Sequence, residues 1–128
     1  MQSQFATNNA SQTVNDSDPP LTLINVAITP IAGVDRLRYK AYVKFTTTSV
    51  SGLGDVTFTI ADAVQGGTVV DGSITFASPG VADVIMLEWE DGTAAAGAHN
   101  VTLAMSVSAV GGTATATLVY LAVDEIAP

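Results

Sequence analysis

Residues 36–47 read Arg-Leu-Arg-Tyr-Lys-Ala-Tyr-Val-Lys-Phe-Thr-Thr, and they alternate between two kinds of side chain. The odd positions are mostly apolar: Leu37, Tyr39, Ala41, Val43 and Phe45. The even positions are Arg36, Arg38, Lys40, Tyr42 and Lys44. Successive side chains of a β-strand point to opposite faces, so this period of two predicts a strand with one buried and one solvated face.

Six further segments have the composition of strands and are separated by Gly, Pro, Ser and Asp. They span residues 21–29, 56–60, 68–76, 82–90, 100–110 and 113–123. Gly111-Gly112 is a two-residue turn typical of a hairpin. No segment has the pattern of a stable helix. About seven antiparallel strands with short connections predict an all-β fold, most simply a β-sandwich, with a small barrel as the alternative.

The first twenty residues differ from the rest of the chain. They are rich in Gln, Ser, Asn, Thr and Asp, and Phe5 and Val14 are their only large apolar residues after Met1. Such a segment buries too little apolar surface to offset its ordering entropy. We therefore expect an extended polar N-terminal arm over residues 1–20 and a β-sandwich domain over residues 21–128. The arm has three candidate supports, which are its own domain, a sister subunit or another protein.

The inventory of reactive side chains argues against an enzyme. There is no cysteine, and His99 is the single histidine. Thiolate zinc sites, cysteine nucleophiles and sites with several histidines are therefore excluded within one chain. A Ser–His–acid triad would have to use His99, which has no nucleophile-elbow sequence near it. The oxygen-rich run Asn15-Asp16-Ser17-Asp18 lacks EF-hand spacing, so we predict no metal and no cofactor.

Charge and hydropathy also limit the partners. Four basic residues face twelve acidic ones, which gives a net charge of −8. An acidic chain is repelled by nucleic acid and by anionic lipid. No run approaches the roughly 18–20 apolar residues of a membrane helix, and the first ten residues lack the pattern of a secretory signal. We expect neither a nucleic-acid nor a membrane partner.

All the basic residues lie at even positions of one predicted strand, and we call them the basic stripe: Arg36, Arg38, Lys40 and Lys44. Two interpretations are open. The stripe is paired with Glu88 and Glu90 on a neighbouring strand, or it is a docking face for an acidic surface such as a capsid shell or a sister subunit. The predicted partner-binding residues are the basic stripe, Tyr42 within it, and the arm residues Phe5 and Val14.

Two segments carry a family resemblance. Ile85-Met-Leu87-Glu-Trp89, followed after a turn by Ala96-Gly-Ala-His99-Asn-Val101-Thr-Leu103, resembles the E-strand, E–F corner and F-strand of immunoglobulin-like modules of the bacterial adhesion and cell-surface type. His99 stands where many such modules have the corner tyrosine, and the cysteine pair of antibody domains is absent. The resemblance implies an Ig-like β-sandwich, a fold that hosts many unrelated functions.

The whole profile is similar to that of decoration or cement proteins of tailed-bacteriophage heads. Those proteins are acidic, free of cysteine, rich in Ala, Gly, Thr and Val, and extended by an N-terminal arm that grips the capsid. This similarity implies a virion structural protein on the capsid surface, with a major capsid protein or another virion protein as partner and with its own copies in a symmetric assembly. The alternative is a carbohydrate- or surface-binding module of a larger extracellular protein, for which Tyr42 and Tyr120 are the candidate stacking residues.

Overall fold

Strands account for almost all the regular structure of the computed structural model, which describes residues 2–30 and 36–126. They are β1 (Ser3–Asn8), β2 (Gln12–Asn15), β3 (Leu21–Ile28), β4 (Arg36–Thr48), β5 (Leu53–Asp62), β6 (Gly67–Ala77), β7 (Ala82–Asp91), β8 (His99–Ser108) and β9 (Thr113–Ile126). A 3-10 turn, η1 (Ala63–Gln65), joins β5 to β6.

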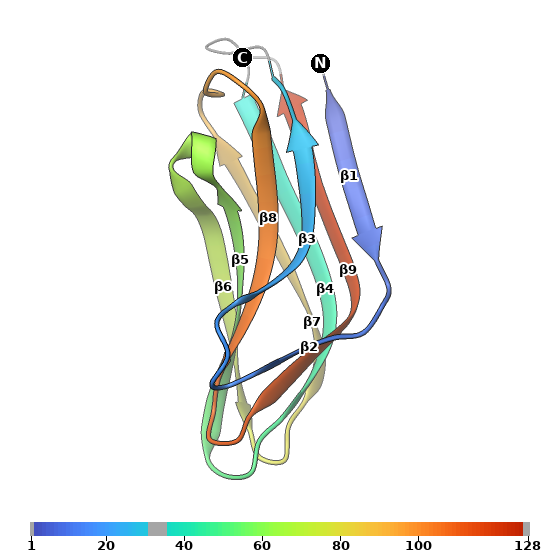
Figure 1. Cartoon of the computed structure of the whole chain (residues 1–128), viewed down its shortest axis with the longest axis vertical. Coiled ribbons are helices and arrows are strands. Elements are labelled where there is room, and N and C mark those ends of the chain that lie inside the picture. Colours follow the sequence, from blue (N-terminus) through green and yellow to red (C-terminus); the bar gives the residue numbers. More distant parts are fainter. Residues whose placement is uncertain (1, 31–35, 127–128) are drawn as a thin grey trace.

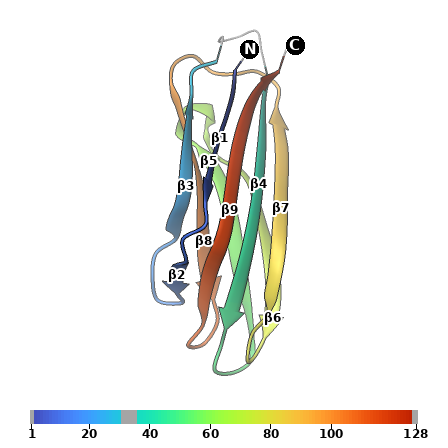
Figure 2. The same ribbon diagram turned by 90° about the vertical axis from the view of Figure 1, so that its right-hand side faces the viewer.

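The strands form two sheets that face each other (Figures 1 and 2). Sheet A has the order β1-β9-β4-β7, with β2 pairing on the same edge of β9 as β1 does, and sheet B has the order β3-β8-β5-β6. Every pair is antiparallel. The predicted all-β sandwich of antiparallel strands is confirmed, with two further strands supplied by residues 3–15.

The two halves of the chain pair as mirror images along the sequence. β1 and β2 pair with β9, β3 with β8, β4 with β7, and β5 with β6. The chain is therefore one long antiparallel hairpin folded over on itself, so that successive pairs alternate between the sheets. With β1 and β2 counted as one strand, this nesting is the order of a jelly roll.

The strand order differs in part from the one that the Ig-like resemblance implies. The neighbouring position of residues 36–47 and 82–90 is confirmed, because β4 pairs with β7. In an Ig domain, however, the first strand of the sandwich lies beside the second, and the last lies beside the sixth. Here β3 pairs with β8, and β9 pairs with β4. The N-terminal segment occupies the other edge of β9, so β9 lies inside sheet A, between that segment and β4.

The N-terminal segment rests on the chain's own sheet. Phe5 lies opposite Ala122 of β9, and Val14 lies opposite Ala114. Val14 is only 2% exposed and belongs to the hydrophobic core. Of the three supports considered for the arm, the structure therefore shows the first. The division of the chain at residue 20 stays a prediction.

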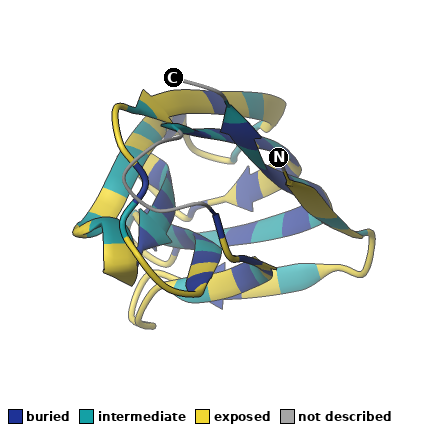
Figure 3. Cartoon of the chain, turned by 90° about the horizontal axis from the view of Figure 1, so that it is seen from above, coloured by how far each residue is buried: buried dark blue, intermediate teal, exposed yellow. Residues whose placement is uncertain are grey.

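The core lies between the sheets and follows the alternation of β4. The odd-numbered side chains from Leu37 to Phe45 are buried, whereas the even-numbered ones are half-buried or exposed. Phe45 meets Phe58 of sheet B with ring centroids 5.0 Å apart. Figure 3 shows the resulting alternation of buried and exposed residues along the strands. Sheet A therefore presents its even-numbered β4 residues to the outside.

Val14 and Phe5 are expected to differ in their effect on stability. Val14→Ala removes two buried methyl groups and should lower the free energy of unfolding by about 2 kcal/mol. Phe5→Ala changes a side chain that is 67% exposed and should cost less than about 1 kcal/mol. Urea denaturation of both variants checks this. Equal losses would contradict the assignment of Val14 to the core and Phe5 to the surface.

Candidate functional site

The outer face of sheet A brings together side chains from β1, β9, β4 and β7. Met86, Tyr42, Tyr120 and Thr7 lie in one row across the four strands. The next row contains Glu88, Lys40, Ala122 and Phe5. Residues directly opposite one another in a sheet share a face, so the two rows form one continuous surface.

Four members of these rows form an apolar band, in which two side chains are exposed and the two tyrosines are half-buried: Phe5, Met86, Tyr42 and Tyr120. Phe5 is 67% exposed and Met86 is 76% exposed. The rings of Phe5 and Tyr120 lie with their centroids 6.1 Å apart. Tyr42, Tyr120 and Met86 also line a hollow of about 330 Å³, together with Lys40, Ala41, Leu87 and Glu88. Exposed apolar surface with a polar rim is typical of an interaction site.

One half of the basic stripe is paired within the chain. Arg36 lies 2.5 Å from Glu90, and Arg38 lies 3.6 Å from Glu90 and 3.9 Å from Glu88. These are cross-strand contacts between β4 and β7, so the pairing interpretation is confirmed for the two arginines. All four side chains are about a third exposed or more, and such pairs contribute at most about 1 kcal/mol each.

The other half of the stripe is open. Lys40 and Lys44 are exposed, and within residues 2–30 and 36–126 no carboxylate lies at ion-pair distance from either. They share the outer face with Tyr42 between them, about 13–14 Å apart at 3.4 Å per residue. A second hollow of about 260 Å³ continues the surface along β4 past Lys44 to Val84 of β7. The two lysines are therefore positioned to meet an acidic group on another molecule.

The predicted partner-binding residues thus fall into three groups. Phe5, Tyr42, Lys40 and Lys44 come together on one open surface. Arg36 and Arg38 share that face but are engaged with glutamates. Val14 needs correction as an anchor, because its side chain is buried against the chain's own core and does not reach a partner. That the remaining residues bind a partner stays a prediction.

Met86 was not among the partner-binding residues predicted from the sequence. In the structure it is the most exposed member of the band. A signal was present, because Met86 shares its parity with Glu88 and Glu90 in the alternating run 82–90. That parity places an apolar side chain on the solvated face of a strand, which is the unusual feature.

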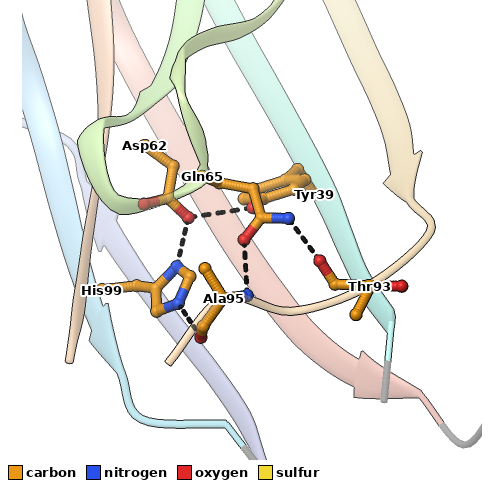
Figure 4. Close-up of polar contacts among 6 residues, drawn as sticks. All are labelled: Tyr39, Asp62, Gln65, Thr93, Ala95 and His99. Atoms are coloured by element: carbon orange, nitrogen blue, oxygen red, sulfur yellow. Dashed lines mark hydrogen bonds and ion pairs between the residues drawn. The ribbon is translucent and has the colours of Figure 1, made fainter. Parts of the chain in front are cut away.

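A second polar site lies inside the sandwich, around His99 (Figure 4). The His99 Nδ1 atom lies 2.6 Å from the Asp62 Oδ2 atom, to which the Tyr39 hydroxyl also donates at 2.9 Å. The His99 Nε2 atom lies 2.9 Å from the Ala95 carbonyl oxygen. His99 is 1% exposed, and Asp62 and Tyr39 are fully buried. Burial and the Asp62 carboxylate raise the pKa of Tyr39, so its hydroxyl stays protonated and donates.

The same network orders the segment between β7 and β8. Gln65 donates to the Thr93 carbonyl oxygen and accepts from the Ala95 amide at 2.9 Å. Ala95 in turn accepts from His99, so one loop is held from both sides. Asp62 was not singled out from the sequence, although its even position beside Val56, Phe58 and Ile60 put an acid on a buried face.

The geometry does not suit His99 to general-base catalysis. Both ring nitrogens face an acceptor inside the chain, the carboxylate on one side and the Ala95 carbonyl on the other. A general base needs a free nitrogen within hydrogen-bond reach of the group that it deprotonates. The network therefore has the form of a structural connection between β5, β8, β4 and the loop.

The remaining candidate sites offer little evidence of a function. In the Asn15–Asp18 run, the Asp18 carboxylate accepts from the Asn15 amide and so closes a turn. No group of three or more His, Cys, Asp or Glu side chains with metal-binding geometry occurs in the described part of the chain. Nor does that part contain a helix with the length and hydropathy to cross a membrane.

Comparison with known proteins gives a fold likeness and no family. No family model matches the chain, and no curated protein sequence matches it. Among solved structures, the infectious bursal disease virus Gx strain gives a TM-score of 0.60 at 17% identity, covering 98% of this chain and 32% of that chain. The VP2 subviral particle of the same virus gives 0.56 at 19% identity, with 98% and 33% covered.

These similarities concern the fold alone, and this chain spans about a third of each viral protein. A carbohydrate-binding module of Cellvibrio mixtus lichenase 5A, solved with cellotriose, is similar over 91% of this chain and 88% of its own at 17% identity. Its TM-score of 0.38 is too low to support an argument about this protein.

The His99 network predicts a stability that falls as the pH rises. Burial lowers the pKa of His99, but the bonds to the Ala95 carbonyl and the Asp62 carboxylate outweigh it and raise that pKa above its ordinary 6.5. A raised folded-state pKa gives a stabilisation that is fully present below the unfolded pKa. It is lost as the pH rises through the folded pKa.

Urea denaturation from about pH 6 to 10 should therefore show a falling free energy of unfolding for the wild type. His99→Gln keeps a neutral hydrogen-bonding side chain and serves as the control, in which this part of the slope should vanish. The same slope in both proteins would show that His99 is not the titrating group.

Proposed function

We propose that the chain is a non-enzymatic structural subunit of a virus particle, in the role of a capsid decoration, cement or head-fibre protein. It attaches through the outer face of sheet A to an acidic surface of a capsid or of sister subunits. The observation that carries the proposal is the gathering of Lys40, Lys44 and the apolar band on one open face of a chain whose net charge is −8.

The chemistry of this face suits adhesion. Tyrosine and phenylalanine supply large contact areas at low entropic cost, and tyrosine is enriched among residues that dominate binding energy. The lysines steer an acidic partner and fix its orientation, which affects the association rate more than the final affinity. A single copy binds weakly through so small a face, but many copies on a symmetric shell gain avidity.

The fold likeness supports the particle setting. The viral structures named above include a VP2 subviral particle, and they share the sandwich over nearly the whole of this chain. The N-terminal segment contributes to the same face, because β1 carries Phe5 beside Tyr120. The N-terminal segment therefore stays paired with β9 when the chain attaches, and Phe5 is its contact residue.

One observation favours a second candidate function, a carbohydrate-binding module. Tyr42 and Tyr120 line the hollow of about 330 Å³, and Lys40 and Glu88 at its rim supply polar groups. Aromatic side chains with a few convergent polar groups are the usual components of a small-ligand site. In this role the same face would bind a sugar in place of an acidic protein surface.

Particle attachment is tested with a charge variant and a matched control. Lys40→Gln/Lys44→Gln removes the two open cations, whereas Asn25→Asp/Asn100→Asp adds two carboxylates on the outer face of sheet B. Both variants make the net charge of −8 more negative by two units. We expect the lysine variant to lose at least about tenfold in binding to particles that lack the chain, and the control to bind as the wild type does.

The measurement is co-sedimentation with density-gradient-banded particles, with the bound chain counted by quantitative mass spectrometry. Binding of the wild type should weaken as salt rises, since screening acts on exposed charges. Equal losses in both variants would mean that net charge matters and the face does not. Absence of the chain from native particles would refute the particle role.

Tyr42→Ala, tested on a glycan array, distinguishes the carbohydrate-binding function from particle attachment. A module of that class should bind members of a glycan array, and the variant should lose that binding by about 1–3 kcal/mol for one stacked ring. Tyr42 is half-buried, so the stability of Tyr42→Ala is checked by urea denaturation against the wild type. No glycan binding by the wild type would remove this candidate.

A further inference from the structure

The free edge of β7 differs from the other sheet edges. Sheet A ends at β7, and within the described residues no strand pairs with its outer side, which Figure 2 shows at the rim of the molecule. Its centre reads Val84-Ile-Met-Leu87, without proline, glycine or a register shift. Long, regular and apolar edges are those at which another strand adds.

The remaining edges are interrupted. β1 and β2 are separate short strands with a break between Asn8 and Gln12. β3 has a register shift between Thr22 and Ile24. β6 carries Gly72 at its centre, and its pairing with β5 has a register shift between Ile60 and Ala61. Such features are common ways of blocking strand addition, so among the described edges β7 stands out as open.

The backbone pattern identifies which residues face this edge. The Thr47 amide donates to the Val81 carbonyl oxygen at 2.8 Å, which makes Thr47 and Val81 a hydrogen-bonded pair. Antiparallel pairs alternate, so the odd-numbered residues of β7 bond to β4. The amides and carbonyls of the even-numbered residues therefore point away from the sheet. The Val84 amide follows this pattern, because it donates to the exposed Asp83 carboxylate at 2.8 Å and not to a carbonyl oxygen of β4.

We propose that β7 is a self-association edge, at which a second copy of this chain adds its own β7 antiparallel about a two-fold axis at Met86. This goes beyond the proposed function and does not depend on it. In this register each Met86 exchanges both backbone bonds with its counterpart, and Val84 does the same with Glu88 of the second copy. The bond from Val84 to Asp83 is replaced by one to a carbonyl oxygen.

The side chains disfavour one of the two neighbouring registers. Centred on Met86, the pairing sets Glu88 opposite Val84, Glu90 opposite Ala82, and Trp89 opposite Asp83, with no acid facing an acid. A shift of one residue, centred on Leu87, would set Asp83 against Asp91. It would therefore place like charges directly opposite, which destabilises a pair.

Charge and apolar contact also match across the axis. Lys44 lies beside Val84, so Glu88 of the second copy comes two strands away, about 10 Å between Cα atoms and within reach of the two long side chains. The lysine that lacks an acidic neighbour within the described chain thereby gains one. Met86, which is 76% exposed, meets its own counterpart, and the apolar bands of the two copies become continuous.

Cysteine cross-linking tests the axis, because the chain has no cysteine of its own. In Met86→Cys the paired Cα atoms would lie roughly 5.5 Å apart, within disulfide range. In Val84→Cys they would lie roughly 14 Å apart, since each residue faces position 88. We expect oxidation to give a covalent dimer of Met86→Cys and none of Val84→Cys or of the exposed control Leu53→Cys. Equal cross-linking of all three, or of none, would overturn the register.

Light scattering tests the association itself. At about 0.15 M salt, which screens the repulsion between two acidic chains, the wild type should approach twice 13.0 kDa as its concentration rises. Met86→Lys should raise the dimer dissociation constant at least about tenfold, whereas the control Leu53→Lys should leave it unchanged. A wild type that stays monomeric throughout, or a dimer indifferent to Met86→Lys, would overturn the proposal. Particle attachment is measured separately, by the co-sedimentation of Lys40→Gln/Lys44→Gln described above.

Discussion

The register of β4 between β7 and β9 is the constraint on which the rest of the structure depends. A slip of one residue would turn the basic stripe into the core and expose Leu37, Val43 and Phe45. Burying four cations without partners costs far more than any gain in strand pairing. The register is therefore fixed by the alternation of β4, and with it the composition of the outer face of sheet A.

That register determines both the outer face of sheet A and part of a buried polar network. On the outside, Arg36 and Arg38 are satisfied by the glutamates of β7, which leaves Lys40, Lys44 and the apolar band as the open part of the surface. On the inside, the same strand delivers the Tyr39 hydroxyl to Asp62 and His99. One alternating strand thus supplies both the candidate contact surface and part of a buried network that holds the loop after β7.

The N-terminal segment illustrates how composition and topology compete. Its polar sequence correctly indicates that it has little core of its own, yet β9 offers it an edge, and backbone bonding along that edge requires no apolar side chains. Val14 then enters the core and Phe5 remains outside. Once β9 has taken this neighbour on one side and β4 on the other, the sandwich adopts the nested order of a jelly roll, and β7 is left as a free end of sheet A.

The sequence by itself determined the strands from β3 onward, the all-β class and the two faces of β4, because side-chain alternation is a local property. It also placed the basic stripe and Tyr42 on one strand face, and their role in binding stays a prediction, as does that of Phe5. Only the tertiary structure decided that Val14 is buried, that Arg36 and Arg38 are paired while Lys40 and Lys44 are open, and that Asp62 meets His99. Each of these depends on which strands lie side by side, and pairing between residues far apart in the chain leaves no periodic signal in any one of them.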